Sequence, residues 1–125
     1  MREMTAKLAG KDITLAASFK ASVEVAQKVA DPMLIARELA VEERMMEVGL
    51  SYRPTWQANT ENVPVIIHIG MKAAGDKREL DDVQELVFDH GIVNASGIAM
   101  EYLSLLLSPQ PRVKSEESAD TPGKP

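Results

Sequence analysis

Turn and capping residues divide this sequence into one segment that alternates like a β-hairpin and five segments that repeat like helices. On either side of Ala9-Gly10-Lys11, polar and apolar residues alternate, which predicts two short strands joined by a tight turn over residues 5–15. A two-stranded sheet is only marginally stable alone. Its apolar face must therefore pack on the helices that follow, and the predicted fold class is α+β, mostly α.

Clear start and stop signals delimit the predicted helices. Asp31-Pro32 should open one of them, because Asp can cap free backbone amides and Pro is tolerated in the first turn. Gly49, Gly75 and Gly91 are placed to end three others. The five predicted helices span residues 18–29, 32–48, 60–74, 82–90 and 93–107, and residues 50–59 form the main internal loop.

Helical spacing also predicts which faces are buried. In the first helix, Phe19, Val23, Ala26 and Val29 form an apolar stripe, while Glu24 and Lys28 should pair on the solvent side. Asp81 and Gln84 resemble a capping box at the start of the fourth helix. In the last helix the predicted core residues are Ala95, Ile98, Ala99, Tyr102, Leu103 and Leu106.

Length and composition favour one compact domain over residues 1–108. The chain has 125 residues, is 45% hydrophobic and only 4% aromatic, so its core must be built from aliphatic side chains. Residues 109–125 contain four prolines and only Val113 and Ala119 as apolar groups. We expect this segment to be a disordered tail, because it cannot bury enough surface to offset its ordering entropy.

Charge and residue types argue against several functions. The net charge of −5 is a poor match for nucleic acid, which needs clustered Lys and Arg. The absence of cysteine excludes disulfides, thiolate zinc sites and cysteine nucleophiles. The sequence also has neither the apolar run of a signal peptide nor that of a membrane span, so we expect a soluble, cytoplasmic protein.

The motifs that could support catalysis lack the residues or the spacing that the chemistry requires. Gly70 to Arg78 superficially resembles a phosphate-binding loop, but Asp76 stands where Lys is required, and a helix stop explains the glycines better. His68 and His90 lack the spacing of metal ligands and are expected to be structural. The acidic pairs 42–43 and 81–82 fit solvated helix faces and caps. The sequence therefore predicts no catalytic, cofactor or metal site and no small-molecule substrate.

Protein binding is the remaining prediction. Methionine side chains are flexible and polarizable, so they can adapt to varied apolar partners, although core filling is the alternative. Met45 and Met46 lie beside a charged stretch, which makes them the best candidates for exposure. The predicted partner-binding residues are Met45, Met46, Tyr52, Trp56 and Met71.

Three segments carry a resemblance to a known family: Ala6–Leu15, Val63–Gly75 and Leu80–Gly91. Taken in this order, they resemble the small tail protein family of gene transfer agents and related siphophages. That family has a strand-Gly-strand opening, a helix, an Ile-x-x-Gly-x-x-x-Ala-Gly segment, a short capped helix and a terminal apolar helix. The likeness covers residues 5–108, and the stretch from Arg37 to Gln57 is longer than usual.

The resemblance implies a role in tail assembly. The family is described both as tail tube protein and as tail assembly chaperone, and a tube subunit would need enough strands to close a β-ring. A single hairpin with five helices favours the chaperone. Such a protein coats the tape measure protein in the host cytoplasm, recruits tail tube protein and is absent from the mature particle.

Two other functions stay open on the sequence. A minor tube or connector component would remain in the particle. A small helical regulator would need a basic recognition helix, whereas Glu101 is the only charged residue of the last predicted helix. A homo-oligomer is compatible with any of these roles.

Overall fold

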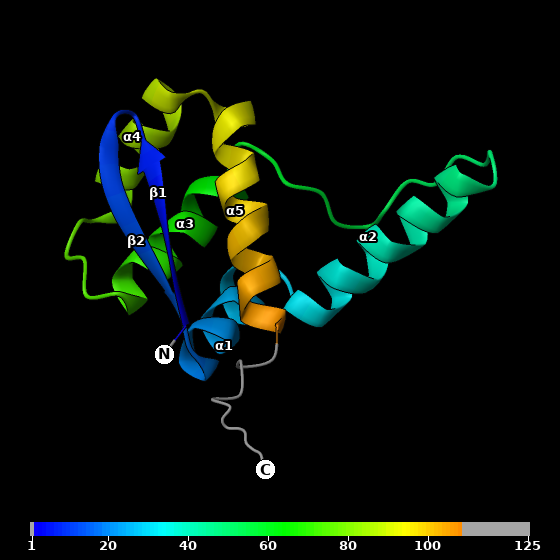
Figure 1. Ribbon diagram of the computed structural model, residues 1–125, viewed down its shortest axis with the longest axis horizontal. Helices are drawn as coiled ribbons and strands as arrows, with labels where there is room; N and C mark the ends of the chain where they lie inside the picture. The colour runs from blue at the N-terminus through cyan, green and yellow to red at the C-terminus, as the bar shows by residue number, and fades with distance from the viewer. Residues whose placement is uncertain (1, 109–125) are drawn as a thin grey trace, which may run out of the picture.

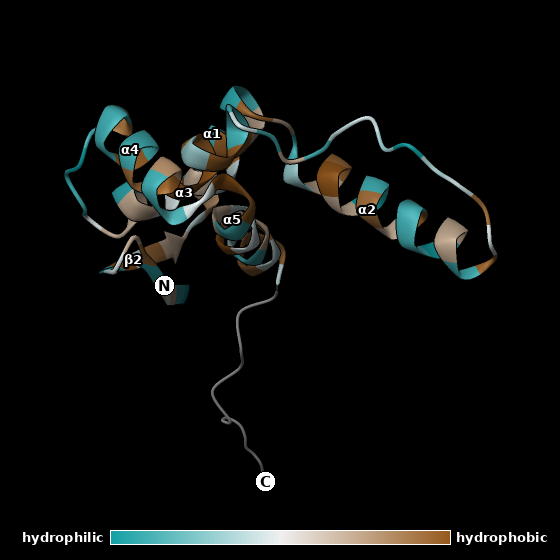
Figure 2. Cartoon of the chain, turned by 90° about the horizontal axis from the view of Figure 1, so that it is seen from above, coloured by the Kyte–Doolittle hydropathy of each residue, from teal (hydrophilic) through white to brown (hydrophobic). Residues whose placement is uncertain are grey.

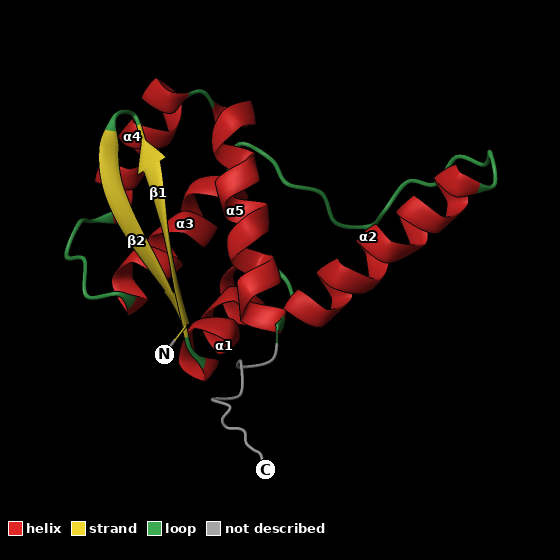
Figure 3. Ribbon diagram, viewed as in Figure 1, coloured by secondary structure: helices red, strands yellow, loops and turns green. Residues whose placement is uncertain are grey.

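The computed structural model describes residues 2–108 and contains a β-hairpin followed by five α-helices, as the sequence predicts (Figure 1). Figure 3 shows the two strands lying against the helices, with a long loop after the second helix. The elements are β1 (Arg2–Leu8), β2 (Lys11–Ala17), α1 (Phe19–Lys28), α2 (Pro32–Glu47), α3 (Asn62–Ala73), α4 (Leu80–His90) and α5 (Ile92–Leu107). The predicted disorder of residues 109–125 lies outside the described residues.

The hairpin turns at Ala9 and Gly10, with φ angles of 53° and 79°. Two successive positive φ angles are the mark of a type I′ turn, whose twist matches that of the flanking strands. The strands pair antiparallel over their whole length, with Leu8 opposite Lys11 and Arg2 opposite Ala17. Leu8, Ile13 and Leu15 are buried on the inner face, which confirms the predicted alternation.

Helix α3 is the centre of the domain. It packs against β2, α5, α4 and α1, and most of its residues are buried. Gly70 allows the close contact with β2, because a Cβ added there would lie 2.8 Å from Leu15 Cδ2. The helix ends at Gly75, whose φ is +91°, as the sequence predicts.

Helix α2 extends away from the other elements (Figures 1 and 2). Asp31 caps its start by accepting a hydrogen bond from the Met33 amide at 3.0 Å. Ile35, near this start, is buried, whereas residues 46–50 at the far end are exposed. Gly49 ends the helix with a φ of 79°, and the chain then returns through residues 50–61. We call residues 40–53 the arm.

Two details of the sequence prediction are wrong. Helix α1 buries Ala21 and Val25, while Phe19 is 86% exposed and Val23 and Ala26 are exposed as well. Val29, the fourth residue of the predicted stripe, is partly buried and packs against the core, so the prediction is wrong at Phe19, Val23 and Ala26 only. Helix α4 begins two residues earlier than predicted, with Glu79 as its N-cap; the Glu79 amide donates to Asp82 Oδ2 at 3.2 Å.

Helix α5 buries five of its six predicted core residues, and Ile98 is only partly buried. The Tyr102 hydroxyl donates a 2.6 Å hydrogen bond to the Ala16 carbonyl oxygen on β2. Burial raises the pKa of Tyr102 far above its ordinary value, so the hydroxyl keeps its proton. Within residues 2–108, no helix combines the length and apolar character needed to cross a bilayer.

Candidate partner-binding surface

An apolar groove of about 380 Å³ lies between the first turns of α2 and the second half of α5. Buried Ile35 and Leu103 lie at its base, and Leu39 and Met100 are partly buried. Leu107 is 41% exposed and lies at the end of α5. Ala36, Ser104 and Ser108 complete the lining of the groove. The groove therefore has an apolar base and two hydroxyl groups.

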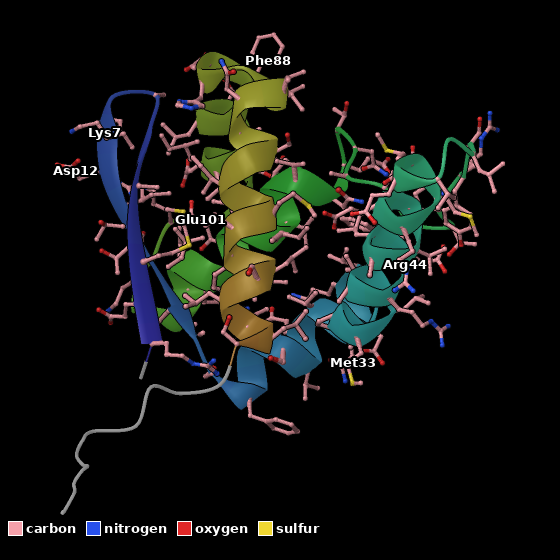
Figure 4. The ribbon with its side chains drawn as sticks, turned by 45° about the vertical axis from the view of Figure 1, so that its right-hand side comes forward. Lys7, Asp12, Met33, Arg44, Phe88 and Glu101 are labelled. Carbon is pink, nitrogen blue, oxygen red and sulfur yellow. The ribbon has the colours of Figure 1, made fainter. Side chains whose placement is uncertain are left out.

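A smaller hollow of about 240 Å³ lies where α3 begins and α4 meets α5. Pro64, Val87 and Ile92 line it together with Phe88, whose side chain is 72% exposed. Figure 4 shows Phe88 at the end of the molecule formed by the α4–α5 junction. Val93, just beyond the hollow on α5, is 85% exposed. Large apolar side chains this exposed are suited to contact a partner.

One carboxylate joins the returning loop to α2. Glu38 is buried, and its Oε1 accepts hydrogen bonds from the Thr55 amide at 2.8 Å and the Tyr52 hydroxyl at 2.9 Å. The Thr55 amide, followed by the Tyr52 hydroxyl, holds the pKa of Glu38 below its ordinary value of 4.5. The hydrogen bond between the Tyr52 hydroxyl and Glu38 also raises the pKa of Tyr52. The arm is therefore anchored by an ionised side chain.

The structure separates the five predicted partner-binding residues. Met46 is 67% exposed on the arm and Met45 is partly exposed, so both can meet a partner. Tyr52 is half-buried against Glu38. Trp56 and Met71 are core residues, with only 9% and 1% of their surface exposed, so neither offers a contact surface in this fold.

The residues that line the α2–α5 groove were not predicted from the sequence as partner-binding residues. The sequence did carry a signal in the three consecutive leucines Leu105, Leu106 and Leu107. Adjacent residues of a helix point in different directions, so these three cannot all face the core. Apolar residues recur along α2 out to its far end (Figure 2), beyond the part that packs on other helices. Val41, Met45 and Met46 alternate there with charged residues, and the exposed Met46 offers an apolar side chain to another protein.

Both histidines make structural hydrogen bonds. His90 Nδ1 accepts from the Ala9 amide at 2.9 Å and so holds the hairpin turn against α4. His68 Nε2 lies 3.0 Å from the Arg78 carbonyl oxygen. Within residues 2–108, both rings form hydrogen bonds with backbone groups, and neither forms one with another histidine or with an acidic side chain.

Glu24 forms the one ion-pair cluster of the described residues, with Lys28 Nζ at 2.8 Å and Lys72 Nζ at 2.6 Å. Burial raises the pKa of Glu24, but hydrogen bonds from the two lysines outweigh this effect and hold it below 4.5. The predicted Glu24–Lys28 pair is thus confirmed, and it also links α1 to α3. Over residues 2–108, no three His, Cys, Asp or Glu side chains gather as a metal site would require.

Comparison with known proteins gives no further identification: no protein-family model, curated protein or solved structure matches this chain.

Proposed function

We propose that this chain is a tail assembly chaperone of a tailed phage or a gene transfer agent, and that it binds apolar helical segments of the tape measure protein. The observation that carries the proposal is the apolar groove between α2 and α5 beside a projecting arm. A partner helix can place apolar side chains at spacings of three and four residues into such a groove. The acidic surface of the chain would keep the complex dispersed.

The order of the family-like segments supports the same proposal. They coincide with the hairpin, with α3 and its end, and with α4. Gly70 and Gly75 have physical roles there, one in close packing and the other in ending the helix. A tube subunit would need strands for a closed ring, and residues 2–108 form a sheet of only two strands. The chaperone role is therefore preferred to the tube role.

Co-expression with the tape measure gene of the same gene cluster tests the proposal. The tape measure protein should be soluble with this chain and aggregate without it. If it is equally soluble alone, the chaperone role is wrong. Mass spectrometry of purified particles tests the alternative, because a minor tube or connector component would be present there, whereas the chaperone should remain in the host cytoplasm.

Two variants on the same helix test the groove itself. Leu107→Lys places a charge in the groove and should reduce the amount of tape measure protein held in solution. Asn94→Lys places the same charge on an exposed residue of α5 that lines neither hollow and serves as the matched control. Equal effects of both variants would show that the groove is not the binding surface.

A further inference from the structure

The outer edge of β1 carries backbone groups that are not used within the described residues. Because Ala9 and Gly10 form a two-residue turn, Leu8 and Lys11 close the hairpin as a hydrogen-bonded pair. Hydrogen-bonded and non-hydrogen-bonded pairs alternate along an antiparallel ladder. The N–H and C=O groups of Glu3, Thr5 and Lys7 therefore point away from β2.

A contact on the other strand agrees with this alternation. Ala16 is the register partner of Glu3, so its backbone groups should also point away from the ladder. Its carbonyl oxygen does so and accepts the hydrogen bond from Tyr102. The outer edge of β2 is thus partly satisfied by α5. Within residues 2–108, the backbone of Glu3, Thr5 and Lys7 makes no hydrogen bond outside the hairpin, and β1 faces the viewer unobscured in Figure 1.

The side chains of these three residues are exposed and run from negative through neutral to positive. Lys7 forms a 2.7 Å ion pair with Asp12 on β2, and both side chains remain largely exposed. Figure 4 shows Lys7 and Asp12 on the side of the hairpin that faces away from α5. Glu3 has no ion-pair partner within the described part of the chain.

We propose that two copies of this protein pair through their β1 edges, antiparallel, to form a four-stranded sheet across a two-fold axis. In the register centred on Thr5, each Thr5 lies opposite its counterpart, and Glu3 of each copy lies opposite Lys7 of the other. This register uses the outward-pointing backbone groups of all three residues. The interface is self-complementary, as a two-fold axis requires.

Charge selects this arrangement over the alternatives. Charged residues on an edge strand ordinarily discourage pairing. Here an antiparallel shift by two residues would place Glu3 opposite Thr5 and leave the charges unmatched. A parallel arrangement in register would place like charges opposite each other, which is unfavourable. Only the register centred on Thr5 matches both charges, so the edge pairs with a second copy rather than with any available strand.

A charge-exchange experiment tests the proposal by sedimentation equilibrium. Glu3→Lys and Lys7→Glu each place like charges opposite each other at two points of the dimer, so each variant alone should be monomeric where the wild type is dimeric. In a mixture of the two variants, opposite charges face each other at both points. The mixture should therefore form a heterodimer, and circular dichroism of each variant verifies that it is folded.

A proline pair tests the backbone contacts. Thr5→Pro removes an N–H that points away from β2, so the hairpin ladder is kept while the edge is blocked. Thr14→Pro removes the equivalent N–H on the opposite edge of the hairpin and is the matched control, because Thr14 is the register partner of Thr5. Thr5→Pro should raise the dimer Kd at least about tenfold, a loss of about 1.4 kcal/mol, and Thr14→Pro should leave it near the wild-type value.

Three results would overturn the inference. The first is a wild-type protein that stays monomeric up to about 1 mM, which corresponds to a binding free energy weaker than about −4 kcal/mol. The second is a mixture of folded charge variants that fails to associate. The third is a Thr5→Pro dimer as stable as the wild type. None of these outcomes depends on the proposed chaperone role.

Discussion

The contact between Gly70 and Leu15 gives the sharpest test of how α3 packs under the hairpin. A Cβ added at Gly70 would lie 2.8 Å from Leu15 Cδ2 and 2.9 Å from Leu15 Cβ. Carbon atoms in favourable contact are about 3.5–4.0 Å apart. Leu15 cannot remove the clash by changing rotamer, because its own Cβ is one of the close atoms. The backbone of β2 or α3 must move instead.

Two opposing terms set the expected size of the effect of Gly70→Ala. Overpacking in a core costs about 1–3 kcal/mol. Replacing Gly by Ala inside a helix contributes about 0.5–1 kcal/mol of stability. The net change should be destabilising by up to about 2.5 kcal/mol, measured as the free energy of unfolding from urea titrations followed by circular dichroism.

Gly97 provides the matched control, since it lies within α5, is exposed and has no atom within 4 Å of an added Cβ. Gly97→Ala should therefore show the helix gain alone and raise the free energy of unfolding by about 0.5–1 kcal/mol. The difference between the two variants isolates the cost of the clash. If Gly70→Ala stabilises the protein as much as Gly97→Ala does, the packing argument is refuted.

Three further predictions follow from buried or shared hydrogen bonds. Tyr102→Phe leaves the Ala16 carbonyl without its donor and should lower the free energy of unfolding by about 1–3 kcal/mol in the same urea assay; an unchanged value would contradict the role of this bond. His90→Ala removes the acceptor of the Ala9 amide and should cost about 1 kcal/mol, with faster hydrogen exchange at Ala9 as the direct sign. Because the pKa of Glu38 is depressed in the folded protein, its contribution is complete above pH 4.5 and is lost as the pH falls through the lower folded-state value. The protection factor of the Thr55 amide, which corrects for the slower intrinsic hydrogen exchange in acid, should therefore fall on acidification, and Glu38→Gln should remove most of this pH dependence; an acid step that persists in the variant would exclude Glu38 as its cause.

Local signals account for most of the elements. The positive φ angles at Gly49, Gly75 and Gly91 are where a glycine stop was predicted, since only local backbone geometry decides them. The buried face of α1 was predicted wrongly at Phe19 because Phe19 is more hydrophobic than Ala21, whereas the structure buries Ala21 and Val25 and leaves Phe19 exposed. The N-cap of α4 was misplaced because several acidic residues near its start can each accept a backbone amide.

The binding surface was less accessible from the sequence. Met46 was expected to be exposed because charged residues surround it, and it is. Trp56 and Met71 are buried because residues far apart in the chain close over them, which no local pattern reports. The α2–α5 groove likewise depends on how Ile35 and Leu103 come together, and Glu38 becomes buried only when the loop returns to it.

The shape of α2 has a practical consequence. The chain reverses direction at Gly49, where an added Cβ would meet no atom within 4 Å, and the residues around it are exposed. Solvent-exposed turns of this kind tolerate inserted peptides well. A peptide tag or fluorophore placed between Val48 and Ser51 would therefore leave both the hairpin edge and the α5 helix undisturbed, and would report directly on whether a partner contacts the arm.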